Sequence, residues 1–121
     1  MTRPIAMIVE DDPQLGWIFA KALEEHFDTE IINDGRDAFM RLDQVAPAII
    51  VLDLNLPGMD GTDILHGIRQ DARLQHSRVI LCTADNHSAE PLQEIADIVM
   101  LKPVSPKQLR DIAVRLYPAN C

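Results

Sequence analysis

Short runs of consecutive apolar residues recur along the chain and alternate with segments whose apolar residues are spaced as in helices. Unbroken apolar runs of this kind are typical of strands that are covered on both faces of a sheet. In the intervening segments, such as residues 15–23 and 38–45, the apolar side chains fall on one stripe of a helix. Strands are therefore predicted at residues 5–9, 48–52, 79–82 and 98–101 and, with a more polar sequence, at residues 30–33.

Helix starts are marked by short polar residues that commonly cap helices, each followed by proline or glycine. These pairs are Asp12 before Pro13, Asp34 before Gly35 and Ser105 before Pro106. Five repeats of strand and helix require a parallel sheet with right-handed crossovers and helices on both faces. We therefore predict one doubly wound α/β domain over residues 1–121, whose last helix is closed by Tyr117 and Pro118.

Polar side chains follow most of the predicted strands, at the carboxyl end of each. In a doubly wound sheet, ligands bind outside the carboxyl ends of the strands. For Asp12 we favour the role of a helix cap over that of a ligand, because Pro13 follows it. The residues expected to converge on this edge are Glu10, Asp11 and Asp12 after the first strand, Asp53 and Asn55 after residues 48–52, Thr83, and Lys102.

Three carboxylates at one edge of a sheet, those of Glu10, Asp11 and Asp53, repel one another unless a cation lies between them. A set of oxygen ligands without histidine or cysteine suits Mg²⁺. We interpret Asp11 and Asp53 as direct ligands and Glu10 as a ligand either directly or through water. The backbone carbonyl of Asn55 is expected to fill a further position.

The same residues can carry out phosphoryl transfer, which depends on a nucleophile and on stabilisation of charge at the phosphoryl oxygens. The carboxylate of Asp53 can supply the nucleophile, and the product would be an acyl phosphate. Besides the cation, the ammonium of Lys102 and the hydroxyl of Thr83 are expected to stabilise the transferred group. The backbone N–H groups of Asn55 and Ala84 are further candidate donors.

The composition limits the classes of binding partner and the cellular location that we expect. A net charge of −8, from 11 Lys and Arg against 19 Asp and Glu, disfavours direct binding to nucleic acid or to an anionic membrane surface. No run approaches the roughly 20 apolar residues of a membrane span, so a cytoplasmic protein is expected. Cys82 lies in an apolar run and Cys121 is the last residue, which argues against a disulfide framework. The histidines lack metal-ligand spacing and give no indication of a zinc site; they are His26, His66, His76 and His87.

Four short motifs, IVEDDP, VLDLNLPGMDG, LCTA and LKP, carry a resemblance to a known family. In their order and spacing, the chain resembles the receiver domains of two-component response regulators over essentially its whole length. The resemblance implies a flavodoxin-like fold with strand order 2-1-3-4-5. The implied roles are the acidic pair for Glu10 and Asp11, the phosphorylated aspartate for Asp53, the switch hydroxyl for Thr83, and the family's lysine for Lys102, which Pro103 follows.

The resemblance also implies how such a protein works. The phosphoryl group comes from a histidine kinase or a histidine phosphotransfer protein, with Mg²⁺, and is lost by slow hydrolysis. The chain is then a signalling phospho-acceptor and not a classical enzyme, and its output passes to an unknown downstream protein. Asn55 and Asp85 occupy positions that help to set the hydrolysis rate in the family. Because the chain starts at Met1 and carries no output domain, a standalone regulator is expected.

The chain departs from the family pattern in two places. Three residues before Lys102, where most receivers have Tyr or Phe, this chain has Val99, which has no ring to swing. The stretch between Thr83 and Lys102 is also about one turn shorter than usual and contains Pro91, so a short fourth helix is predicted. We therefore predict an atypical surface of helix four, strand five and helix five, apolar along its edge strand, that serves for docking or homodimerisation.

Two alternative functions follow from the same residues. The first is a degenerate receiver that serves as a phosphorylation-independent interaction module, which Val99 and the short fourth helix suggest. The second is a phosphatase of the haloacid dehalogenase type, because residues 60–62 read Asp-Gly-Thr as in that family's motif. Position 58 is glycine, so the nucleophile of that motif is absent.

Overall fold

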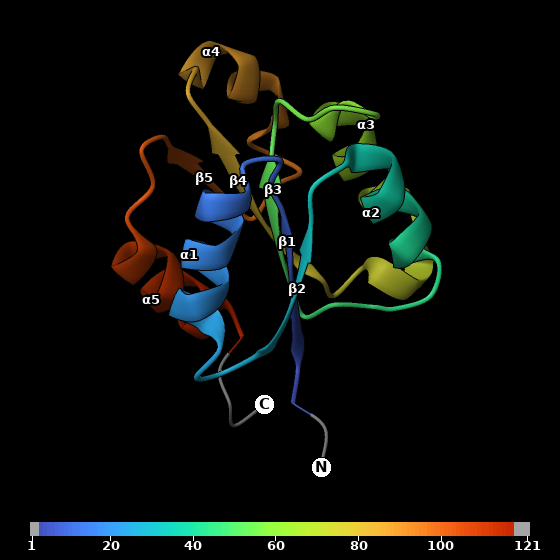
Figure 1. Ribbon diagram of the computed structural model, residues 1–121. Coiled ribbons are helices and arrows are strands. Elements are labelled where there is room, and N and C mark those ends of the chain that lie inside the picture. The colour runs from blue at the N-terminus through green and yellow to red at the C-terminus, as the bar shows by residue number, and fades with distance from the viewer. Residues whose placement is uncertain (1–2, 118–121) are drawn as a thin grey trace.

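The protein forms a five-stranded parallel sheet between two layers of helices (Figure 1). The structure, a computed structural model, describes residues 3–117. The strand order is β2-β1-β3-β4-β5, so the predicted fold class and the strand order implied by the family resemblance are both confirmed. The strands are β1 (Ile5–Val9), β2 (Asp28–Ile32), β3 (Ile49–Asp53), β4 (Arg78–Thr83) and β5 (Ile98–Leu101).

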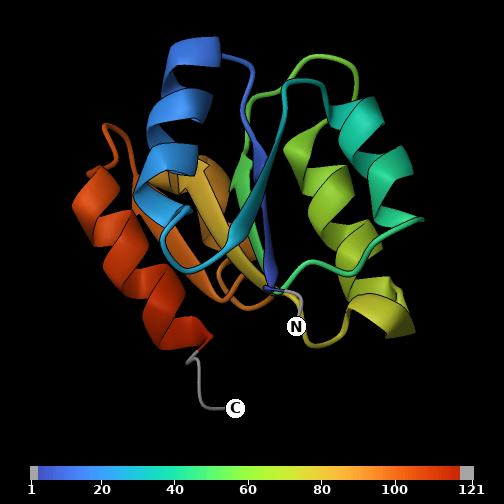
Figure 2. The same cartoon turned by 60° about the horizontal axis from the view of Figure 1, so that its bottom comes forward.

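The helices are divided between the two faces of the sheet. Helices α1 and α5 cover one face, and α2 and α3 cover the other (Figures 1 and 2). No helix within residues 3–117 is long and apolar enough to cross a membrane. The helices are α1 (Pro13–Leu23), α2 (Gly35–Leu42), α3 (Gly61–Gln70), α4 (Asn86–Ala89) and α5 (Pro106–Leu116), with 3-10 turns η1 (Ala72–Leu74) and η2 (Glu90–Leu92).

Each central strand sends alternate side chains into two separate cores, which explains why the strand sequences are apolar without interruption. On β3, Ile50 and Leu52 belong to the core under α2 and α3, while Ile49 and Val51 belong to the core under α1 and α5. All four are nearly or fully buried. Burial of each such side chain stabilises the fold by about 1.5–3 kcal/mol relative to an exposed one.

The three predicted capping residues cap helices in the structure. The carboxylate of Asp12 accepts hydrogen bonds from the backbone nitrogens at the start of α1, and that of Asp34 does the same for α2. The hydroxyl of Ser105 accepts from the nitrogen of Gln108 in α5. The cap interpretation of Asp12 is therefore confirmed by its hydrogen bonds. The last described helix ends at Leu116, while Pro118 and Cys121 lie outside the described residues.

The bounds of β2 differ from the prediction, which placed this strand at residues 30–33. Residues 28–32 pair with all five residues of β1, from Ile5 opposite Asp28 to Val9 opposite Ile32. Because β2 is an edge strand, it is paired on one side only and its residues are exposed or half-buried. Its apolar signal is correspondingly weak, and pairing with β1 sets its start.

The short fourth helix is confirmed, because α4 has four residues and gives way to a 3-10 turn that contains Pro91. The edge strand β5 is less exposed than predicted. Met100 is buried in the core under α1 and α5, and Val99 packs against the core on the opposite face. Leu101, which is 52% exposed, is the main apolar contribution of β5 to the surface.

The turn that leads into β5 is held by a charged network around Asp97. One carboxylate oxygen of Asp97 accepts from the backbone nitrogen of Val79 at 2.7 Å and from the guanidinium of Arg69 at 2.6 Å. Arg69, on α3, also donates to the backbone carbonyls of Ile95 and Ser77. This network ties α3 to the starts of β4 and β5.

We expect the substitution Asp97→Ala to lower the free energy of unfolding by about 2–4 kcal/mol, because it removes the carboxylate that pairs with Arg69 and accepts from the amide of Val79. The matched control is Asp111→Ala, which breaks the exposed ion pair with Arg110 and should change that free energy by less than about 0.5 kcal/mol. Urea denaturation followed by circular dichroism measures both. Equal losses in the two variants would contradict the assigned role of Asp97.

Candidate metal and phosphoryl-transfer site

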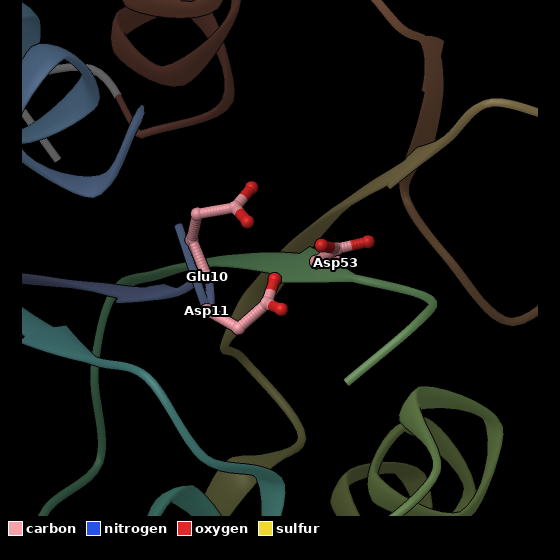
Figure 3. Close-up of side chains that lie close together, drawn as sticks. All are labelled: Glu10, Asp11 and Asp53. Atoms are coloured by element: carbon pink, nitrogen blue, oxygen red, sulfur yellow. The ribbon is translucent and has the colours of Figure 1, made fainter. Parts of the chain in front are cut away.

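The predicted site residues meet at one edge of the sheet, beyond the carboxyl ends of the strands. Glu10 and Asp11 follow β1, and Asp53 ends the neighbouring strand β3 (Figure 3). Thr83 ends β4, and Lys102 follows β5. The strand order places β1 beside β3, which brings the acidic pair next to Asp53.

Glu10, Asp11 and Asp53 each offer a carboxylate oxygen, and these oxygens lie within 4.8 Å of one another. The side chains of Glu10 and Asp53 are buried, at 3% and 2% exposure, whereas Asp11 is exposed. Three oxygen ligands, one of them open to solvent, fit a hard divalent cation that keeps several of its waters. The acidic cluster could therefore hold a metal ion.

The ammonium of Lys102 lies beside this cluster. Its Nζ is 2.9 Å from Oδ2 of Asp53, within an ion pair whose carboxylate is almost fully buried. Burial alone would lower the pKa of Lys102, but the hydrogen bond with Asp53 and the negative charges of Asp53 and Glu10 outweigh it, so the pKa is raised. Lys102 is therefore a fixed positive charge at the site.

The charged form of Glu10 is disfavoured in the absence of a cation. Desolvation by burial, together with the nearby charge of Asp53, raises its pKa from 4.5 to about 7, against the lowering effect of the backbone N–H of Asp12. That N–H donates to Oε2 of Glu10 at 3.2 Å. The carboxylate of Asp12 itself is engaged in capping α1 and lies outside the acidic cluster.

The loop that follows β3 shapes the other side of the site. Its backbone nitrogen at Asn55 donates to Oδ1 of Asp53 at 3.1 Å, so one of the two predicted backbone donors contacts the carboxylate directly. The residues after Asp53 line, with Asp11, an open cavity of about 530 Å³. The lining residues of the loop are Leu54, Asn55, Leu56, Pro57, Gly58, Met59 and Asp60.

The hydroxyl of Thr83 is engaged by the loop that follows β4. It accepts from the backbone nitrogen of Asp85 and donates to the carbonyl of the same residue, at 3.1 Å in each case. The carboxylate of Asp85 in turn caps α4, accepting from the backbone nitrogen of His87 and from the hydroxyl of Ser88. The sequence associates Asp85 with the site but does not predict its hydrogen bonds with Thr83. Its signal is an aspartate directly before a predicted helix.

Val99 does not lie at the acidic cluster. It pairs with Leu81, two residues before Thr83 on β4, and packs against the core that includes Ala89 of α4 and Leu92. Val99 also lines a groove of about 420 Å³ formed by residues of β5 and α5, together with Leu101. Val99 therefore contacts both the core and this groove.

Comparison with known proteins agrees with this arrangement. Residues 6–114 match the family model of the response regulator receiver domain. The DNA-binding response regulator MtrA of Mycolicibacterium smegmatis is 34% identical over 111 residues, which cover 88% of this chain and 47% of MtrA. The hybrid signal transduction histidine kinase D of Dictyostelium discoideum is 26% identical over 110 residues, which cover 88% of this chain and 7% of the kinase.

Solved structures show the same architecture. The signal receiver domain of a LuxO repressor protein from Vibrio parahaemolyticus superposes with a TM-score of 0.83 at 28% identity, covering 98% of this chain and 93% of that one. The chemotaxis response regulator CheY4 of Vibrio cholerae shares the fold with a TM-score of 0.86 at 19% identity, covering 95% and 99% of the two chains.

The chain belongs to the response regulator receiver domain family of two-component signal transduction. Members of this family act in signalling and are not classical enzymes. The chain spans about half the length of the MtrA proteins that it matches.

In magnesium-free buffer, we expect Glu10→Gln to stabilise the protein above pH 7. Since the pKa of Glu10 is raised to about 7 in the folded state, wild-type stability is lost as pH rises from about 4.5 through about 7. A glutamine does not ionise, so above pH 7 the variant should exceed the wild type by about 1–2 kcal/mol and show a flatter pH profile. Urea denaturation in EDTA at pH 5 to 8 measures the difference. Parallel profiles for the two proteins would contradict it.

Proposed function

We propose that the protein accepts a phosphoryl group on Asp53 from a phosphohistidine donor in a magnesium-dependent reaction, and that this modification changes its binding to other proteins. The observation that carries the proposal is the ion pair of 2.9 Å between Lys102 and the buried carboxylate of Asp53, beside the oxygens of Glu10 and Asp11. Burying a carboxylate beside a cation and two further acids costs free energy, so stability of the fold does not explain this arrangement. It suits a group that reacts with a phosphate.

The chemistry follows from the two oxygens of Asp53. One of them attacks phosphorus, an O–P bond forms, and the N–P bond of the donor breaks with its electron pair left on the imidazole nitrogen. The ammonium of Lys102 and the backbone N–H of Asn55, which contact the two carboxylate oxygens of Asp53, would contact the incoming phosphoryl oxygens. Mg²⁺, held by Glu10, Asp11, Asp53 and the carbonyl of Asn55, would offset the charge of the carboxylates and the phosphoryl group.

The switch in this proposal is Thr83. To contact a phosphoryl group, its hydroxyl must exchange the two hydrogen bonds with the backbone of Asp85 for one with a phosphoryl oxygen. That exchange frees the residue that caps α4. Val99, which packs against the core that includes Ala89 of α4, would then adjust by repacking, because it has no aromatic ring to rotate.

The phosphoryl donor in this proposal is a histidine kinase or a histidine phosphotransfer protein, and the target is another protein. MtrA is called a DNA-binding response regulator, but this chain matches less than half of its length. A net charge of −8 disfavours contact of this domain with nucleic acid or with an anionic membrane surface. We therefore assign its output to protein contacts in the cytoplasm.

Phosphorylation of Asp53 is tested by intact-protein mass spectrometry after incubation with acetyl phosphate. We expect the wild type to gain one phosphoryl group only when Mg²⁺ is present, and Asp53→Asn to gain none. Asp12→Asn is the matched control, because asparagine also caps helices well, and it should react as the wild type does. A wild type that gains no phosphoryl group would instead favour the phosphorylation-independent interaction module.

The surface of α4, β5 and α5 is the output surface in this proposal, through a homodimer that forms on activation. We expect the wild type with beryllofluoride and Mg²⁺ to dimerise and Leu101→Glu to remain monomeric, because the charge lies in the exposed part of the β5 groove. Ile31→Glu, at an exposed apolar position of the opposite edge strand, is the control and should dimerise. Analytical ultracentrifugation measures the association. A dimer that survives Leu101→Glu would rule out this face.

A further inference from the structure

The loop from residue 54 to residue 60 leaves the sheet after Leu54, whose backbone nitrogen still donates to the carbonyl of Cys82 on β4. It contributes the N–H of Asn55 that contacts Asp53, and it lines the cavity beside Asp11. Beyond Leu54 the loop runs outside the strands and turns at Gly58, whose φ is +85°. The contacts of this outer part therefore help to set where the backbone of Asn55 lies.

The first turn of α2 contacts the middle of the loop. The backbone nitrogen of Gly35 donates to the carbonyl of Pro57 at 2.9 Å. A Cβ atom at Gly35 would lie 2.2 Å from the carbonyl oxygen of Met59, which is a backbone atom and cannot rotate away. The helix and the loop are thus in contact at a distance that only glycine permits.

A second contact joins the residue before Gly35 to the loop residue between Pro57 and Met59. The carboxylate of Asp34 faces Gly58, where an added Cβ would lie 2.5 Å from Oδ1. Asp34 is itself fixed, because Oδ1 accepts hydrogen bonds from the backbone nitrogens of Arg36 and Asp37 at 2.8 and 3.2 Å. Asp34, the capping residue of α2, therefore also packs against the loop at Gly58.

We propose that Asp34 and Gly35 are positioning residues for the metal site, acting through the loop that carries Asn55. This inference rests on the magnesium site of the proposed function and adds two residues to it. Residues that orient the ligands of a metal affect its affinity without touching it. Displacing the loop moves the backbone of Asn55, and with it both the expected carbonyl ligand and the N–H bonded to Asp53.

The test is the magnesium affinity of Gly35→Ala, measured by ¹H–¹⁵N NMR titration of the intact chain. We expect an affinity about tenfold weaker than that of the wild type, at the lower end of losses for groups outside the ligand shell. The acetyl phosphate reaction should recover to within about twofold of the wild type once Mg²⁺ is saturating. Recovery at saturation separates a displaced metal site from a generally damaged fold.

The matched control is Gly67→Ala, another glycine-to-alanine change in a helix. There the added Cβ meets the ring edge of Phe39 at 2.9 Å, and a half-exposed side chain can rotate away. Its magnesium affinity should stay within about twofold of the wild type, because the loop is untouched. Equal affinities for wild type and Gly35→Ala, or equal losses in both variants, would overturn the inference.

A second measurement uses the wild type alone and decides the matter if Gly35→Ala does not fold. The amide of Gly35 should exchange its hydrogen more slowly when Mg²⁺ is added, because ordering the loop strengthens its bond to Pro57. The amide of Ala48, bonded to Ile5 at the opposite end of the sheet, is the reference and should slow less. Equal slowing would overturn the inference alone, whereas a wild type without magnesium affinity would overturn the proposed function as well.

Discussion

The burial of two carboxylates beside a single ammonium is the interaction on which the rest of the site depends. Asp53 and Glu10 are almost fully removed from water, and Lys102 is the cation that pairs with Asp53. Burial, and after it the nearby charge of Asp53, raises the pKa of Glu10 to about 7, although Lys102 acts in the opposite direction. A bound cation would offset the remaining negative charge of the cluster.

The strand order converts local sequence into this charge arrangement. Because β1 and β3 are neighbours, residues that follow each strand face one another although more than 40 positions separate them in the sequence. Lys102 reaches Asp53 from β5, past β4, so the ammonium approaches from the side opposite the acids. If β1 and β3 were not neighbours, the acidic pair would lie far from Asp53. The strand order is therefore what brings the site residues together.

The fold and most of the site could be predicted from the sequence, because both rest on local signals. Uninterrupted apolar runs identify strands buried on two faces, and a polar residue at the end of each run marks the functional edge. The predicted start of β2 was wrong, because the sequence of an edge strand has a weak apolar signal. The contacts of Gly35 with Pro57 and Met59 could not be predicted, since they join distant backbone atoms and depend on how α2 packs.

The short fourth helix suggests how the proposed switch would work although position 99 lacks an aromatic residue. With four residues, α4 has few internal hydrogen bonds and depends on its cap and on the burial of Ala89. The cap is Asp85, and the backbone of Asp85 is held by the hydroxyl of Thr83. A long helix would resist the loss of one cap, whereas this one has little else to hold its first turn. In the proposed switch, movement of the Thr83 hydroxyl would therefore affect α4 through the backbone of Asp85, without an aromatic ring at position 99.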